Sequence, residues 1–353
     1  MKVLPAFLKA YSDSSFTNPH EVVLDTVPPD CMGNFTHMGA KYWGFETSRH
    51  IATSINQEDK HFSYNAEAHH WLDIGLRFRS EIHKISISTK WFTGNQVPEV
   101  SVELFDKTTG QTKTILDHVP LQPDTEHEFD IEPIMASDCH VKCYSEGGIA
   151  RVNLLGHAKD ALYERPNLLS DADISHTSND HYGSPLDAVN GNREVQHMVG
   201  WESARTGFGE HTIFTLARPA VIDTIVVDTY MHRLNPPLSC HIFAAQLESP
   251  LEDSLKKLPR WKLVFPDGDE IIPEDFQKYM LQKSFSPQHK QFDIKLHHTS
   301  DSPWKPLVSF APLKPDTWHE FANMESTSSV NVIYYMHYPN GGIHGLKMFG
   351  QYS

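Results

Sequence analysis

Gly44-Phe45-Glu46-Thr47-Ser48-Arg49 decides the fold, because a second copy of this stretch occurs later in the chain as Gly200-Trp201-Glu202-Ser203-Ala204-Arg205. Two further pairs of segments match in the same order, namely Pro120–Phe129 with Pro312–Phe321 and Glu146–Ile149 with Asn340–Ile343. A segment order that is kept in both halves indicates an internal duplication, and the architecture of the whole chain follows from it.

The two copies differ in length. Glu46 and Glu202 are 156 residues apart, whereas Gly147 and Gly341 are 194 residues apart. The second copy therefore carries a net insertion, and the charged, proline-containing stretch at residues 248–291 is the expected place for it.

The duplication predicts two domains. We expect the first at residues 1–157 and the second, with its linker, at residues 158–353. The first copy has an extra polar loop of its own near residues 52–67. Short helices are expected at residues 251–258 and 273–283, both within the insertion.

Apolar residues within each copy mostly recur at every second position. Ile85 and Ile87 alternate with serines, and Val100, Val102 and Leu104 alternate with polar residues. This period is typical of half-buried antiparallel strands, and no long helical pattern competes with it. We therefore predict an all-β chain of two tandem β-sandwich modules.

The composition excludes several kinds of partner. The formal net charge is −15, with 30 Lys and Arg against 45 Asp and Glu, which argues against binding to nucleic acid. No stretch approaches the length of a transmembrane helix and no signal peptide is recognised, so a cytoplasmic chain without a membrane partner is expected. The four cysteines are too few for a disulfide scaffold and are expected to be reduced thiols. The sequence allows a homo-oligomer without fixing its size.

Cys139, His140 and Cys143 have a spacing that resembles a metal site. On a strand, however, the two cysteines share one face and His140 lies on the other, so a structural zinc is not favoured. A catalytic metal held by scattered histidines is left open. Fingerprints for a serine nucleophile, a phosphate loop and a dinucleotide are missing from the sequence, and we expect no cofactor.

The repeated segments resemble the allantoicase family, whose members hydrolyse allantoate to ureidoglycolate and urea. The family carries in each repeat an Asp-Gly-Trp-Glu-Thr-Arg-Arg segment, a His-Asp-Trp element, an Asp-Thr-x-His-Phe-x-Gly-Asn strand end and a Pro-Asp-Gly-Gly-x-Ala-Arg turn. The resemblance extends from about Phe35 to Gly350 and includes the linker segment Ser178–Ser184. It implies two tandem β-sandwiches of the jelly-roll or discoidin-like type and a small-molecule substrate.

Matching positions supply the candidate site residues. The expected catalytic residues are Glu202, Arg205, His211, Asp228 and His232. The expected substrate-binding residues are Glu46, Arg49, Trp91, Asn95, His140, Arg151, Trp201, Met231 and Tyr334. Each retained Glu-x-x-Arg pair can hold a carboxylate or amide group of a substrate, or orient a general acid. Each can equally be a structural ion pair at a strand end.

Other positions depart from the family pattern. Aromatic, apolar or small residues replace charged groups and imidazoles at Trp43, Ser48, Trp91, Val199, Ala204, Met231, Tyr334 and Gly345. His232 is shifted by one residue from the family histidine, so on a regular strand it would face the opposite side unless a bulge restored its direction. The His-Asp-Trp element becomes His211-Thr212-Ile213, so the family's orienting aspartate is replaced by Thr212.

These replacements favour a larger and more apolar ligand than allantoate. The leading hypothesis is a repurposed allantoicase-like enzyme of specialised metabolism, which holds a reactive apolar substrate for cyclisation or cycloaddition. Allantoate hydrolysis is the first alternative. A non-catalytic β-sandwich that binds a sugar or another small molecule is the second.

Overall fold

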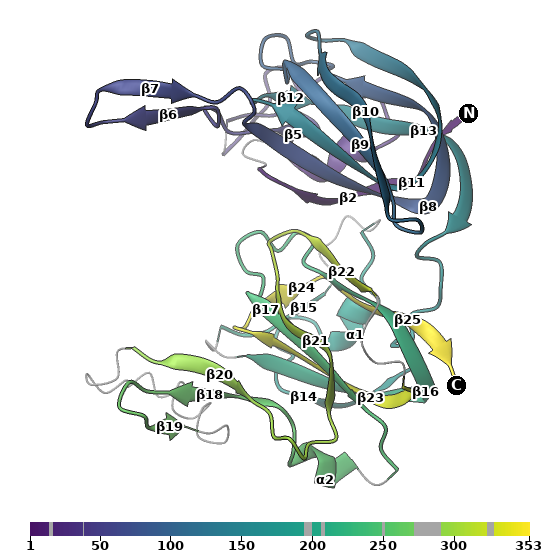
Figure 1. Cartoon of the computed structure of the whole chain (residues 1–353), viewed down its shortest axis with the longest axis vertical. Helices are drawn as coiled ribbons and strands as arrows, with labels where there is room; N and C mark the ends of the chain where they lie inside the picture. Colours follow the sequence, from purple (N-terminus) through teal and green to yellow (C-terminus); the bar gives the residue numbers. More distant parts are fainter. Residues whose placement is uncertain are drawn as a thin grey trace. The chain divides into compact units, whose positions relative to one another are not determined.

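The computed structural model describes residues 1–13, 17–37, 39–193, 200–205, 209–248, 251–271, 291–322 and 328–353. Contacts between residues divide the chain into two compact units, Met1–Arg165 and Pro166–Ser353. Both units are built from large antiparallel sheets, which confirms the prediction of an all-β chain with two repeats (Figure 1). Within the described residues, the search for a helix long and apolar enough to cross a membrane finds none.

Two long strands organise the first unit. β8 (His69–Ser88) pairs with β11 (Glu126–Tyr144) over most of its length, with register shifts between Asp130 and Ile134 and between Ala136 and Asp138. The sheet runs in the order β1-β13-β8-β11-β9-β10, and β2 also pairs with β8. Its other strands are β1 (Lys2–Val3), β2 (Ala6–Tyr11), β9 (Glu99–Asp106), β10 (Gln111–Pro120) and β13 (Arg151–Ala161).

Alternating residues of these strands form the core of the first unit. Ile85, Ile87, Val100 and Val102 are completely buried, as their spacing predicted. Bulges let a strand bend while keeping its apolar face inward, which is how one pair of long strands can serve a compact core.

Smaller elements surround this sheet. β5 (Phe45–Glu46) pairs with β12 (Gly148–Ile149) and so joins two of the repeated segments. β6 (Thr53–Asn56) and β7 (His61–Tyr64) form the hairpin that projects from the body of the unit in Figure 1, where the polar loop was expected. The remaining elements are η1 (Pro19–Val23), β3 (Phe35–Thr36) and β4 (Gly39–Ala40).

The second unit repeats this plan. Its sheet runs in the order β14-β16-β23-β17-β21, with β22 and β25 also paired to β16. β15 (Trp201–Glu202) pairs with β24 (Gly342–Ile343), as β5 pairs with β12. The other elements are β14 (Asp173–Thr177), α1 (Pro185–Val189), β16 (Glu210–Asp228), β17 (Ser239–Ala245), β21 (Lys305–Pro312), β22 (Trp318–Ala322), β23 (Val330–Tyr338) and β25 (Gly345–Tyr352).

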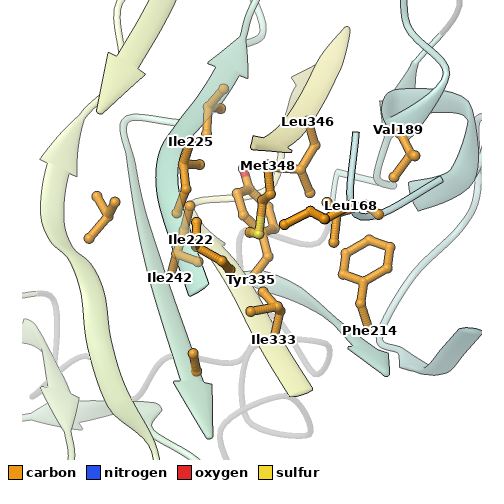
Figure 2. Close-up of a cluster of buried hydrophobic side chains, with 14 of the residues drawn as sticks. Leu168, Val189, Phe214, Ile222, Ile225, Ile242, Ile333, Tyr335, Leu346 and Met348 are labelled. Atoms are coloured by element: carbon orange, nitrogen blue, oxygen red, sulfur yellow. The ribbon is translucent and has the colours of Figure 1, made fainter. Parts of the chain in front are cut away.

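The core of the second unit is shown in Figure 2. Ile225, Ile242, Ile333 and Met348 come from four different strands and meet side by side, with Tyr335 among them. All five side chains are buried. Burial of apolar surface on this scale is the main stabilising contribution in a sheet protein.

The stretch between β17 and β21 forms a small sheet of its own. α2 (Leu251–Leu255) lies within the helix expected at residues 251–258, and it is followed by β18 (Arg260–Val264), β19 (Glu270–Ile271) and β20 (Asp293–His297). The helix expected at residues 273–283 lies outside the described residues. Trp261 and Leu263 of β18 pack in one cluster with Ile213, Phe243 and Tyr334 of the main sheet.

This small sheet explains a difference between the repeats. Ile213, Tyr334 and Phe243 are neighbours across β16, β23 and β17. In the first unit the corresponding neighbours across β8, β11 and β9 are Trp71, Lys142 and Ser101. Lys142 and Ser101 are polar, whereas all three residues that pack with the small sheet in the second unit are apolar or aromatic.

Candidate functional site

His232 lies in a turn and not on a regular strand. β16 ends at Asp228, and Met231 has a φ angle of +65°, so strand alternation stops before His232 is reached. The ring of His232 packs against Gly342 of β24, and the residue is 1% exposed. His232 stands at the position of the family phenylalanine, which the first repeat keeps as Phe92, while Met231 stands at the position of the family histidine and is partly exposed.

Several polar groups surround this imidazole. Glu202 on β15 lies close enough to act electrostatically on His232, as do Asp228 and His344, and the Asn235 side chain is also nearby. Neither ring nitrogen of His232 has a hydrogen-bond partner among the described residues. Burial lowers the pKa of His232, and Glu202 and Asn235 oppose that change. At neutral pH the ring is therefore an uncharged proton acceptor. We call Glu202, Asp228, His232, Asn235 and His344, together with Arg193, the second-repeat cluster.

Arg193 was not expected from the sequence. Its Nε atom donates to Oδ2 of Asp228 at 2.8 Å and its Nη2 atom donates to Oδ1 at 2.6 Å. The guanidinium carbon also lies 5.0 Å from the centroid of the Tyr230 ring. A two-pronged contact of this kind fixes both partners, so Asp228 is a positioned carboxylate held by an arginine. An arginine in a loop after α1 carries no sequence pattern that reveals such a partner.

The first repeat builds the same corner with different chemistry. Phe92 packs against Gly148 as His232 packs against Gly342. Asn95 donates from Nδ2 to Oε1 of Glu46 at 2.9 Å. Burial raises the pKa of Glu46, opposed by Asn95 and by the nearby Arg49. The carboxylate, amide and arginine are retained here, but the imidazole is replaced by an apolar ring.

His211 lies away from the second-repeat cluster. It stands near the start of β16, whereas Asp228 ends that strand. Its ring packs against the rings of Tyr334 and His176, with centroid separations of 5.5 and 5.1 Å. Burial lowers the pKa of His211 to about 3, assisted by His176 and Arg260. The structure thus gives this histidine, one of the expected catalytic residues, packing contacts beside the small sheet.

Tyr334 and Trp201 are core residues. Tyr334 is 1% exposed, and its hydroxyl donates to the carbonyl oxygen of Pro259 at 2.9 Å. Trp201 is fully buried, and its indole nitrogen donates to the carbonyl oxygen of Asn179 at 2.6 Å. Because neither side chain has surface to offer a substrate, we leave both out of the proposed site. Their apolar character reflects packing and not an altered binding cleft.

The remaining expected residues lie in varied surroundings. Arg205 is exposed and Met231 is 40% exposed, so both are at the surface of the second unit. Arg151 is buried, and its guanidinium donates to the carbonyl oxygens of Thr26 at 2.9 Å and Ala150 at 2.7 Å. These two bonds give Arg151 a structural role. Trp91 lines a cavity in the first unit.

His140 lies on the open face of the first sheet. Its Nδ1 atom is 2.5 Å from Oδ1 of Asp73, and its ring lies near that of Trp71. Cys139 and Cys143 point into the core on the other face, where burial raises the pKa of both thiols. The three residues therefore do not converge on one point. No group of three or more metal-ligating side chains occurs among the described residues.

Comparison with known proteins now adds to this geometry. The Allantoicase repeat family matches residues 3–159 and 167–353, which is nearly the whole chain. The chain belongs to the allantoicase family. An allantoicase of Neurospora crassa is 28% identical over 264 residues, covering 68% of this chain and 71% of that protein. A probable allantoicase of Schizosaccharomyces pombe is 24% identical and covers 96% of this chain and 88% of that protein.

One solved structure also matches this chain over most of its length. The allantoicase of Saccharomyces cerevisiae is 20% identical, with coverage of 98% of this chain and 90% of that one, at a TM-score of 0.34. Within this chain the two repeats have diverged from one another at the position of His232 and Phe92.

Proposed function

We propose that this protein hydrolyses a carbon–nitrogen bond in a small ureido-substituted acid of the allantoate type, at the second-repeat cluster. The observation that carries the proposal is that Glu202, on one of the paired strands β15 and β24, lies near enough to the buried imidazole of His232 to act on it electrostatically. Membership of the allantoicase family and the names of the relatives support it.

The cluster has groups suited to each part of such a reaction. Water needs a proton acceptor, and the uncharged imidazole of His232 with the carboxylate of Glu202 beside it can act as one. Arg205, three residues after Glu202, can hold the carboxylate of the substrate by charge-assisted hydrogen bonds. Arg193 and Asp228 hold each other and so give the turn that carries His232 a fixed geometry.

The bonds of the reaction balance as follows. The oxygen of water bonds to the central carbon of the ureido acid, and the bond from that carbon to one ureido nitrogen breaks. The proton taken from water by His232 is returned to the departing nitrogen, which leaves as urea. The remaining product is a hydroxy acid that keeps the second ureido group.

Cyclisation of an apolar substrate, the leading hypothesis from the sequence, has less support. The relatives are named for allantoate hydrolysis, and none of the comparisons points to a cyclase. The described residues of the second-repeat cluster are charged or hydrogen-bonding groups, which suit a polar substrate. Hydrolysis is therefore the function we carry forward.

Urea release from allantoate tests the proposal directly. The purified chain should release urea, and Glu202→Gln should lower the rate by about 100-fold or more, because the carboxylate that assists the proton acceptor His232 is lost. Glu128→Gln, at an exposed position of the first unit, is the matched control and should keep the wild-type rate. Absence of urea release by the wild-type chain contradicts the proposal. Loss of activity in Glu46→Gln, with full activity kept in Glu202→Gln, would place the reaction in the first repeat.

A further inference from the structure

The first unit contains a cavity whose lining includes four aromatic residues. Its volume is about 180 Å³. Trp43, Trp91, Tyr42, Phe35 and Met32 contribute side chains to its lining. For scale, an apolar cavity of roughly 150 Å³ is large enough to hold benzene. The space is therefore sufficient for a ring-containing small molecule.

The two tryptophans are held in place before any ligand arrives. The backbone nitrogen of Trp91 donates to Oδ1 of Asp124 at 2.9 Å, and its indole nitrogen donates to the carbonyl oxygen of Pro28 at 2.9 Å. The indole nitrogen of Trp43 donates to Sγ of Cys31. Since both indole N–H groups already have acceptors, what the rings offer to a ligand is their π surface. Walls fixed in this way lower the entropic cost of binding.

Tyr42 adds a third ring to this wall. It stacks on Phe92, with 5.1 Å between ring centroids and 18° between ring planes. Phe92 is buried and packs on Gly148, so the ring on which Tyr42 stacks is itself held in place. A planar ligand can extend such a stack because offset aromatic rings attract one another.

Lys41 and Lys90 line the cavity together with one acidic residue, Asp30. Nζ of Lys41 lies 5.1 Å from the centroid of the Trp43 ring, and Nζ of Lys90 lies 4.5 Å from that of Trp91. Lys90 also pairs with Asp124 at 3.0 Å. In a chain with a net charge of −15, cations on both tryptophans favour an anionic group on the ligand.

We propose that this cavity binds a planar aromatic small molecule that carries an anionic group. The rings of Trp43 and Trp91 contact its flat faces, and Lys41 and Lys90 hold its charge. The ureido acid proposed as substrate has no ring to stack, and the second-repeat cluster belongs to the other unit. The two proposals therefore stand or fall independently.

Cys31 provides a chemical reporter for this cavity. It lines the cavity and is partly exposed, whereas Cys139, Cys143 and Cys240 are buried. A thiol reagent should therefore modify Cys31 first in the folded chain, and a ligand in the cavity should protect it. Accessibility controls the reaction because burial keeps the other three thiols protonated and unreactive.

Anilinonaphthalene sulfonate, which is aromatic and anionic, is a suitable probe. Its fluorescence should rise on binding to the wild-type chain, and it should slow the modification of Cys31 by dithiobis(nitrobenzoate) by about tenfold at saturation. Trp91→Ala should weaken binding by about tenfold or more. Lys90→Glu keeps the aromatic wall and reverses a charge, so it should weaken binding of the sulfonate more than binding of the uncharged phenylnaphthylamine.

Leu234→Ala is the matched control, since Leu234 is 98% exposed in the second unit, and it should leave probe binding unchanged. Circular dichroism of each variant establishes that it is folded. Two results would overturn the proposal: modification of Cys31 at the same rate with and without saturating probe, or equal probe affinity in the wild type and Lys90→Glu. The comparison of the wild type with Lys90→Glu tests the proposal even if Trp91→Ala does not fold.

Discussion

His232 covers Gly342 so closely that a β-carbon built on this glycine would lie 2.1 Å from Cε1 of the imidazole. Phe92 covers Gly148 in the same way, with a corresponding separation of 2.0 Å from its Cε1 atom. Both repeats thus close this corner by packing a ring on a glycine. Only the second repeat has a ring that can accept a proton.

Gly342→Ala should destabilise the second unit by about 1–3 kcal/mol, because the added methyl group forces the buried ring of His232 to move. The change is measured as a lower midpoint of denaturant unfolding. Gly94→Ala serves as control, because a β-carbon at Gly94 meets no atom within 4 Å. Equal midpoints for Gly342→Ala and the wild type would show that the ring is free to give way.

His232→Phe places in the second repeat the ring that the first repeat already uses at this corner. The variant should fold with a stability close to that of the wild type, because Phe92 shows that the corner accepts the larger apolar ring. Urea release should fall by about 100-fold, since the proton acceptor is removed. Phe92→Leu is the control in the first unit and should keep the rate. Retention of urea release by folded His232→Phe would exclude this histidine from the reaction.

Arg193→Ala should destabilise the chain by roughly 3–5 kcal/mol, because it leaves the buried carboxylate of Asp228 without its partner. The exposed pair of Lys84 and Glu128 is the comparison, and Lys84→Ala should cost much less than Arg193→Ala because water already screens the pair. Urea denaturation measures both changes. A loss in Arg193→Ala no larger than that in Lys84→Ala would mean that Asp228 is satisfied without the arginine.

The sequence was sufficient to predict the all-β class and the duplication, because both depend on short-range period and on repeated segments. Ile85 and Ile87 are buried as the alternation required. The sequence placed His232 one residue past the family histidine, but it did not show that the strand ends at Asp228. The chain turns at Met231, which has a left-handed φ angle. Because such angles are uncommon at residues other than glycine, the sequence gives no signal for this turn.

Tyr334 shows a second limit. Its replacement of a polar family position was interpreted as a change of ligand, yet the residue is covered by the small sheet that contains Trp261. An insertion creates new buried surface on a distant strand, and a local pattern contains no information about that contact. The pairing of Arg193 with Asp228 was missed for the same reason, since 35 residues separate the two in sequence.

Acid should destabilise the second unit well above the pH at which carboxylates titrate. Burial lowers the pKa of His337 to about 3, and that of His211 is also about 3. An unfolded histidine takes up its proton near pH 6.5, so between about pH 6.5 and 3 the unfolded chain binds more protons than the folded chain. Stability is therefore complete above pH 6.5 and falls as the pH drops.

The slope contributed by one such histidine approaches about 1.4 kcal/mol per pH unit. Denaturant unfolding at several pH values between 7 and 4 measures it. His337→Phe should show a shallower slope than the wild type, whereas Leu234→Ala should show the same slope. An unchanged slope in His337→Phe would mean that this imidazole gains its proton as readily in the folded chain as in the unfolded one.

Tyr334→Phe separates packing from catalysis at the face beneath the small sheet. The variant loses the hydrogen bond to the carbonyl oxygen of Pro259 and should be destabilised by about 1 kcal/mol. Trp261→Ala removes an aromatic side chain from the same cluster and should cost about 3–5 kcal/mol. Urea release by folded Tyr334→Phe should equal that of the wild type, because the tyrosine reaches no substrate. A lower rate at unchanged stability would return Tyr334 to the site and would require the small sheet to open during the reaction.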